Sequence, residues 1–166
     1  MKLLFALALP VYALDQITKW WVIGRMPFNG DPEPVIPGFF YLCHWGNTGA
    51  AFSMFHDSNT GFIVLSLVVL AALLVVRWRG GMADWHSRHG VGLLCGGILG
   101  NVTDRILHKH VVDFLLFDLH VPFANPWPAF NVADACICAA AGLFILSSFR
   151  AEAQKPGAAQ TGEPAA

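Results

Sequence analysis

The chain has 166 residues, of which 55% are hydrophobic and only 13% are charged. This charged share is about half the ~25% typical of a soluble domain, and the formal net charge of −1 provides no field that would attract a polyanion. The composition excludes a disordered chain, a nucleic-acid-binding protein and an ordinary cytosolic enzyme. It indicates a small polytopic membrane protein with a single domain over residues 1–150.

Four apolar segments approach the ~20 residues that a helix needs to cross a bilayer. They predict an all-α membrane protein, a bundle of four transmembrane helices over residues 3–23, 60–76, 91–107 and 129–149. The first segment could instead be a cleaved signal peptide. Its apolar character resumes from Trp20 to Ile23, and no lipobox-like cysteine follows, so we expect it to be retained.

The distribution of positive charge predicts the orientation of these spans. If both termini are cytoplasmic, six Lys and Arg residues fall in cytoplasmic segments and two fall in the outer loops 24–59 and 108–128. The excess belongs on the cytoplasmic side, so we expect both termini there. Residues 35–55 mix strand formers with turn residues and predict a small extracytoplasmic β element. Residues 151–166 contain no aromatic residue and predict a disordered cytoplasmic tail.

Polar side chains inside the predicted spans gather at one depth. With a rise of ~1.5 Å per residue, all of them fall toward the outer leaflet, and ionisable groups in a membrane are costly and usually functional. A structural interpretation stays open for some, because buried charges usually occur in pairs. The group consists of Asp15, Lys19, Asn101, Asp104, Arg105, Asn131 and Asp134, with Asp113 just beyond the third span.

Small residues recur every four positions in the third span, a spacing that lets helix backbones approach closely. We expect this face to be a packing surface; it carries Gly92, Gly96 and Gly100.

Asp113 and Asp134 are carboxylates at one depth, and neither has a cation beside it in the sequence. Two carboxylates held close together share a proton and titrate as a pair. Such a pair suits peptide hydrolysis, because one carboxylate activates water while the protonated one polarises the scissile carbonyl. Carboxylates in membranes also serve as proton relays. On these residues alone, the protein could therefore also be a small transporter or a non-catalytic scaffold.

Other chemistries find less support. Ser53 lacks a Gly-x-Ser-x-Gly elbow, and no His-Glu-x-x-His motif occurs. A metal could bind the outer-loop histidines, but their spacing matches no standard site, so we expect neither a metal nor an organic cofactor. These residues are His108, His110 and His120, with Asp118. We expect the four cysteines to be packing residues, with Cys43 in a loop and the other three in apolar segments.

Five sequence blocks, in order, resemble the bacterial lipoprotein signal peptidase (type II signal peptidase) family. The resemblance extends from residue 3 to about residue 149. The blocks are Asp-Gln-Ile-Thr-Lys at 15–19, Asn-Thr-Gly-Ala-Ala-Phe-Ser at 47–53, Gly-Gly-Ile-Leu-Gly-Asn at 96–101 followed by Asp104 and Arg105, Val-Val-Asp-Phe at 111–114, and Phe-Asn-Val-Ala-Asp at 130–134.

The resemblance implies an aspartic endopeptidase of the bacterial inner membrane. Its substrate would be a prolipoprotein whose lipobox cysteine carries diacylglycerol, cut just before that cysteine, and globomycin would inhibit it. The resemblance also implies a β-cradle at the outer membrane surface and a loop that covers the site. The implied catalytic dyad is Asp113 and Asp134; the implied substrate or inhibitor contacts are Asn47 and Arg105; the implied supporting residues are Asp15, Lys19, Asn101 and Asn131.

Two further expectations concern assembly and access. Four spans can bury the dyad within one chain, so we expect a monomer whose partners are lipid and lipidated substrate. We also expect the loop between Gly46 and Asp57 to control the entry of water from the outer side.

Overall fold

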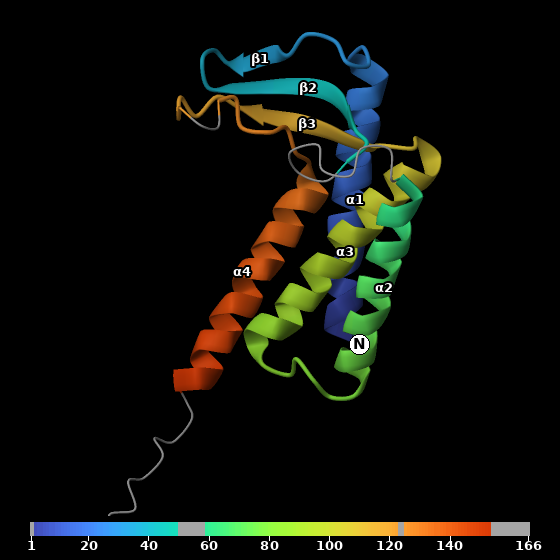
Figure 1. Ribbon diagram of the computed structural model, residues 1–166, viewed down its shortest axis with the longest axis vertical. Helices are drawn as coiled ribbons and strands as arrows, with labels where there is room; N and C mark the ends of the chain where they lie inside the picture. The colour runs from blue at the N-terminus through green and yellow to red at the C-terminus, as the bar shows by residue number, and fades with distance from the viewer. Residues whose placement is uncertain (1, 50–58, 123–124, 154–166) are drawn as a thin grey trace, which may run out of the picture.

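A computed structural model of the chain describes residues 2–49, 59–122 and 125–153. In chain order the elements are α1 (Lys2–Arg25), β1 (Glu33–Ile36), β2 (Phe40–Asn47), α2 (Asn59–Trp78), α3 (Trp85–Leu107), β3 (Val111–Phe117) and α4 (Val132–Ala153). The four helices run alongside one another, and the three strands lie across one end of them (Figure 1). The start of α1 and the end of α4 lie at the opposite end.

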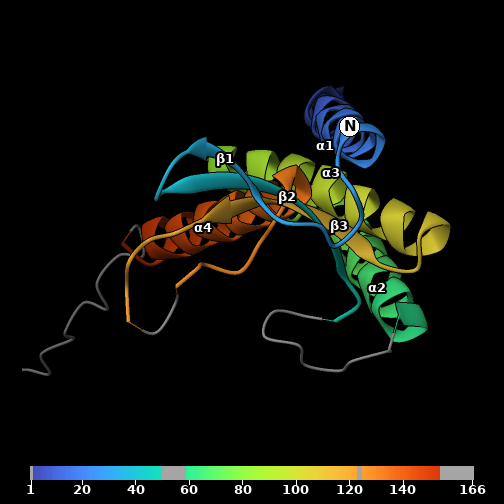
Figure 2. The same ribbon diagram turned by 90° about the horizontal axis from the view of Figure 1, so that it is seen from above.

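Helix α3 is the centre of the helical layer. Helices α1 and α4 both pack extensively on α3, while the backbone of α2 comes close to that of α3 and not to that of α1 or α4 in the described part of the chain. Viewed from the sheet end, α2 and α4 diverge on either side of α3 (Figure 2).

Close packing of α1 on α3 depends on the predicted small-residue face, which the structure confirms. A Cβ added at Gly96 would lie 2.7 Å from Val11 Cβ and 2.8 Å from the carbonyl oxygen of Ala8. A Cβ at Gly92 would meet Leu7, and one at Gly100 would meet the carboxylate of Asp15. No side chain fits between these backbones.

We therefore expect Gly96→Ala to lower the free energy of unfolding by about 1–3 kcal/mol, the usual cost of overpacking. Gly142→Ala is the matched control, because a Cβ there has no neighbour within 4 Å and alanine raises helix propensity by up to about 1 kcal/mol. Reversible unfolding in mixed micelles would measure both changes. Equal stability of the two variants would contradict the packing role of this face.

The outward surfaces of the helices are apolar. Helices α2 and α4 are long and apolar enough to cross a membrane by length and composition. Large hydrophobic side chains lie exposed on both, among them Val64 and Leu65 on α2 and Ile145 and Phe149 on α4. Such continuous apolar exposure marks a surface that is covered by something other than water.

The sheet is antiparallel in the order β1-β2-β3. Strands β1 and β2 supply the β element expected within residues 35–55, although it begins at Glu33. Strand β3 lies in the segment that the sequence analysis leaves as an outer loop. In β2, the register shifts between Leu42 and Trp45, so that Trp45 pairs with Asp113.

Several predicted boundaries are wrong. Helix α3 begins six residues before position 91, because Asp84 caps it by accepting a hydrogen bond from Ser87 N at 3.1 Å. Helix α4 begins at Val132 instead of position 129, and residues 151–153 extend it instead of belonging to the tail. The remaining tail, 154–166, lies outside the described residues. Cys43 is a fully buried residue of β2, not a loop residue.

Candidate active site

Strand β3 presents Asp113 to the helices, with only 3% of the residue exposed. Each carboxylate oxygen accepts a hydrogen bond from a side-chain amide: Asn47 Nδ2 donates to Oδ2 at 3.0 Å, and Asn131 Nδ2 donates to Oδ1 at 2.8 Å. Asn47 reaches it from β2, because Asn47 pairs with Val111 and residues two apart in a strand share a face.

Asp134 lies in the first turn of α4, where Asn131 precedes the helix as its cap. Asn131 Oδ1 accepts from Asp134 N at 2.9 Å, and Asp134 Oδ2 accepts from Asn131 N at 3.2 Å. This reciprocal pair has the form of a capping box. The second carboxylate is therefore held by the same interactions that begin the helix, at the end where the helix dipole favours negative charge.

Asn131 also joins the two carboxylates. Its backbone N–H reaches Asp134 while its side-chain amide reaches Asp113, and the residue is fully buried. The chain returns to β3 just before α4, where Phe130 forms a bridge with Leu115. This bridge brings Asn131 beside the strand.

A second amide fixes the other oxygen of Asp134. Asn101 on α3 donates from Nδ2 to Asp134 Oδ1 at 2.7 Å. Its Oδ1 accepts from Lys19 Nζ at 3.0 Å and from Asn131 Nδ2 at 3.3 Å. Since an ammonium group can only donate, Lys19 determines which way the Asn101 amide points.

Lys19 is a buried cation, 1% exposed, between two buried carboxylates. Its Nζ lies 2.8 Å from Asp15 Oδ2 and 2.7 Å from Asp104 Oδ2. The predicted pairing of Asp15 with Lys19 is therefore present. Asp15 Oδ1 accepts from Ala133 N at 2.9 Å and Asp104 Oδ2 accepts from Val112 N at 3.0 Å. This ion cluster ties α1 and α3 to both segments that carry the dyad candidates.

Arg105 makes different contacts. It donates from Nη2 to the carbonyl oxygen of Gly49 at 3.0 Å, and its guanidinium lies 4.6 Å from the ring centroid of Phe62. Asn59 Nδ2 donates to the carbonyl oxygen of Arg105 at 3.0 Å. Arg105 thus connects the end of β2 and the start of α2 to α3, and none of its described hydrogen bonds reaches Asp113 or Asp134.

Burial raises the pKa of Asp113 to about 7, and the negative charge of Asp134 acts in the same direction. The hydrogen bonds from Asn47 and Asn131 oppose this rise without cancelling it. Asp113 is therefore a carboxyl group that can hold a proton near neutral pH.

The structure joins seven of the eight proposed site residues in one hydrogen-bonded network and leaves Arg105 at its edge. Gln16, which lies within the 15–19 block and was not among the predicted site residues, also joins the network. Its Nε2 donates to Asp104 Oδ1 at 3.0 Å and to Asp15 Oδ2 at 3.2 Å. Asp104, one of the polar residues predicted to gather at one depth, belongs to the same network.

The outer-loop histidines lie outside this network. Nδ1 of His120 lies 3.3 Å from Oδ1 of Asp118, and the ring centroids of His108 and His110 are 6.0 Å apart. In the described ranges, no three His, Cys, Asp or Glu side chains come together as a metal site would require. Most of the loop expected to control water entry, residues 50–57, lies outside the described residues.

Comparisons with known proteins show the family of this chain. The family profile Peptidase_A8, described as "Signal peptidase (SPase) II", matches residues 7–150. "Lipoprotein signal peptidase" of Xylella fastidiosa (strain 9a5c) is 40% identical over 148 residues, 86% of each chain. That of Symbiobacterium thermophilum is 39% identical, covering 84% of this chain and 90% of its own.

Two solved structures of bacterial membrane enzymes have the same fold as this chain. A structure titled as a bacterial membrane enzyme superposes with a TM-score of 0.83 at 28% identity, covering 93% of this chain and 92% of its own. A second, with the same description, gives a TM-score of 0.78 over 89% and 92% of the two chains. The chain therefore belongs to the signal peptidase II family of aspartic-type endopeptidases, and it is a membrane enzyme.

Proposed function

We propose that this enzyme removes the signal peptide from diacylglyceryl-modified prolipoproteins by cutting just before the lipidated cysteine. One observation carries the proposal: Asp113 and Asp134 are held by the same buried Asn131. Two carboxylates in one buried amide network, in a chain of this family, are suited to activating water against a peptide bond.

The proposal places one domain, residues 1–150, in the bacterial inner membrane as four spanning helices. Both termini face the cytoplasm, the sheet lies at the outer surface, and the enzyme acts as a monomer. A diacylated cysteine is anchored in the outer leaflet, so its scissile bond lies near the depth of the dyad. Globomycin-type inhibitors would occupy the same site.

We further propose different roles for the two carboxylates. Asp134 lies at a helix N-terminus and is linked through Asn101 to the ammonium group of Lys19, so it is the ionised base. Asp113 lies on a strand among neutral amides, so it holds the proton. Asn47, Asn101 and Asn131 position the two groups, and Asp15 and Lys19 support them. Arg105 orders the segment after Asn47.

The reaction then balances in two steps. Asp134 takes a proton from water while the water oxygen adds to the scissile carbonyl carbon, and Asp113 gives its proton to the carbonyl oxygen. In the second step, Asp134 returns a proton to the amide nitrogen, Asp113 recovers its proton from one hydroxyl, and the C–N bond breaks. The free carboxyl end of the signal peptide and the amine of the lipidated cysteine are the products.

The direct test is cleavage of a diacylglyceryl-modified prolipoprotein by the purified protein, with the products identified by mass spectrometry. We expect one cut before the lipidated cysteine, and no cut in a matched precursor that lacks diacylglycerol. Cleavage of both precursors at equal rates, or at another bond, would overturn the proposed specificity.

The roles also predict a dependence on pH. The pKa of Asp113 lies at about 7 in the folded chain and near about 4 in the unfolded chain. Between these values only the folded chain binds the proton, so the free energy of unfolding falls as pH rises through this window and levels off above it. We expect kcat/KM to fall above pH 7 as well, because Asp113 loses the proton it donates.

Unfolding of the wild type and of Asp113→Asn, measured from pH 4 to pH 8, isolates this contribution. The free energy of unfolding of the wild type minus that of Asp113→Asn should decrease as the pH rises from about 4 to about 7. A constant difference would show that Asp113 is ionised throughout, which would contradict its role as the acid.

A further inference from the structure

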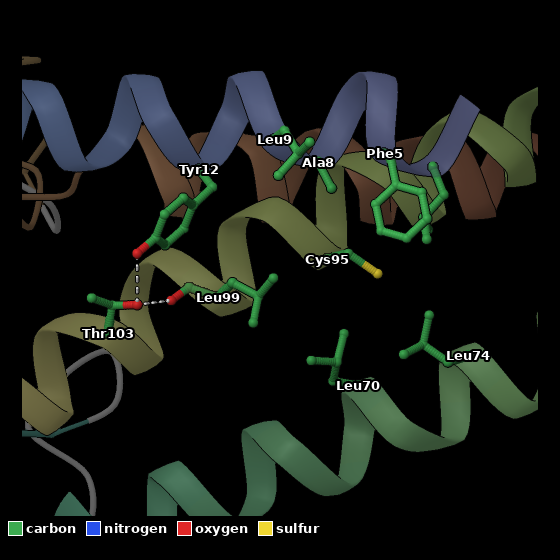
Figure 3. A pocket seen from close by; sticks show the side chains of 10 residues that line it. Phe5, Ala8, Leu9, Tyr12, Leu70, Leu74, Cys95, Leu99 and Thr103 are labelled. Carbon is green, nitrogen blue, oxygen red and sulfur yellow. Dashed lines mark hydrogen bonds between the residues drawn. The ribbon is translucent and has the colours of Figure 1, made fainter. Parts of the chain in front are cut away.

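A second site lies away from the dyad, in an apolar groove of about 400 Å³ bounded by α1, α2 and α3. This volume is within the range of small-molecule sites. Phe5 and Leu9 project from α1, and Leu70 and Leu74 project from α2, on either side of Cys95 of α3 (Figure 3). The groove lies between α1 and α2 because both pack on α3 while their backbones stay apart.

One end of the groove is closed. Thr103 Oγ1 donates to the hydroxyl of Tyr12 at 3.3 Å, joining α1 to α3 (Figure 3). Tyr12 lies one turn before Asp15 and Thr103 directly precedes Asp104, so the closed end abuts the ion cluster. From there the groove extends toward the end of the bundle opposite the sheet, since α1 begins and α2 ends there.

The open end carries positive charge on both walls. Lys2 is three residues before Phe5 and seven before Leu9, and Arg77 is three residues after Leu74 and seven after Leu70. Residues at these spacings lie along one side of a helix.

Asp84, an acidic residue at this end of the bundle, forms hydrogen bonds with serine side chains and backbone. Asp84 accepts hydrogen bonds from Ser87 N at 3.1 Å and from Ser147 Oγ of α4 at 2.9 Å. The groove therefore combines an apolar trough in the membrane-embedded helices with two cations at its mouth.

We propose that this groove binds one anionic phospholipid of the leaflet that faces Lys2 and Arg77, with an acyl chain between α1 and α2 and its phosphate at the two cations. Basic sites between helices at the cytoplasmic face suit anionic headgroups, and the exposed apolar walls suit an acyl chain. Phe5 is 53% exposed and Leu9 is 61% exposed. The site rests on the proposed insertion of all four helices and is independent of the dyad chemistry.

Native mass spectrometry of the purified full-length protein tests the site. Phosphatidylglycerol is compared with phosphatidylcholine of the same acyl chains. Each basic residue near an anionic membrane surface contributes about a fivefold gain in affinity, so we expect Lys2→Gln/Arg77→Gln to weaken phosphatidylglycerol binding by about 25-fold. Leu74→Trp, which fills the groove, should abolish it. Arg150→Gln is the matched control, because Arg150 lies in the last turn of α4, at the same end of the bundle as Lys2 and Arg77. The affinity of this variant for phosphatidylglycerol should remain within about twofold of wild type.

Three results would overturn the proposal: equal affinity for the two lipids, an equal loss in Arg150→Gln, or unchanged binding in Leu74→Trp. Helix content and cleavage of lipidated precursor are measured on the same preparations. Lys2 and Arg77 lie outside the dyad network, so cleavage should persist in their double variant. Loss of lipid binding with intact cleavage is thereby distinguished from a failure of the proposed function.

Discussion

Replacing either dyad carboxylate by its amide is expected to reduce cleavage of a lipidated precursor by about 10⁴-fold or more, as for other residues that act as one catalytic unit. Asparagine at position 113 or 134 cannot accept a proton from water or pass one to the substrate. The double variant should be no slower than the single ones, because each alone already removes the unit.

The two substitutions should differ in their effect on folding. Asp113→Asn takes away the acceptor of one of two buried amides, Asn47 Nδ2 or Asn131 Nδ2, which costs about 1–3 kcal/mol. Near pH 7 it also removes a carboxyl group whose ionised form burial disfavours, so the two effects oppose each other and the net change in stability should be small. Asp134→Asn takes away the acceptor of either Asn131 N or Asn101 Nδ2 and should cost about 1 kcal/mol, the usual value of a helix cap. Asp31→Asn, at an exposed carboxylate, is the control for both measurements. If either dyad variant cleaves at a near-normal rate, the assignment is wrong, and Asp15 and Asp104 are the next carboxylates to substitute.

The second large effect concerns Lys19. Lys19→Met is expected to lower the free energy of unfolding by about 3–5 kcal/mol, because it leaves two buried carboxylates without their cation. Both Asp15 and Asp104 are no more than 2% exposed at their side chains. Denaturant titration in micelles would measure the loss. Lys109→Met, at an exposed lysine, should change stability by no more than about 0.5 kcal/mol.

A double-mutant cycle with Asp15→Asn separates the ion pair from the packing of the lysine stem. The cycle should show coupling of about 0.5–3 kcal/mol between the two sites. A Lys19→Met variant as stable as Lys109→Met would contradict the role of the ion cluster. It would leave the orientation of Asn101 without an explanation.

The helices could be predicted from the sequence because they depend on local patterns, and the depth of the polar groups is a prediction from the same patterns. Apolar runs predict helices, and a fixed rise per residue converts position into depth. The small-residue spacing at Gly92, Gly96 and Gly100 likewise depends on one helix alone. The structure has four helices at these positions and confirms the small-residue face.

Strand β3 could not be read in the same way. Residues 111–117 are almost continuously apolar and four of the first five are buried, so they lack the alternation that marks a strand with one wet face. The partner strand β2 ends 64 residues earlier in the chain, at Asn47, and no local pattern reveals that pairing. The start of α4 did carry a signal: Asn131 and Asp134 have the spacing of a capping box.

The capping arrangement at α4 has a consequence for evolution and engineering. Asn131 and Asp134 begin a helix and, in our proposal, also form part of the reaction centre, so the two roles cannot be optimised separately. A substitution that stabilises the first turn of the helix would change the proposed reaction centre. A substitution that changes the reactivity of the carboxylate would destabilise the first turn of the helix. Variation of this enzyme should therefore accumulate on the exposed apolar faces of α2 and α4, and leave the first turn of α4 unchanged.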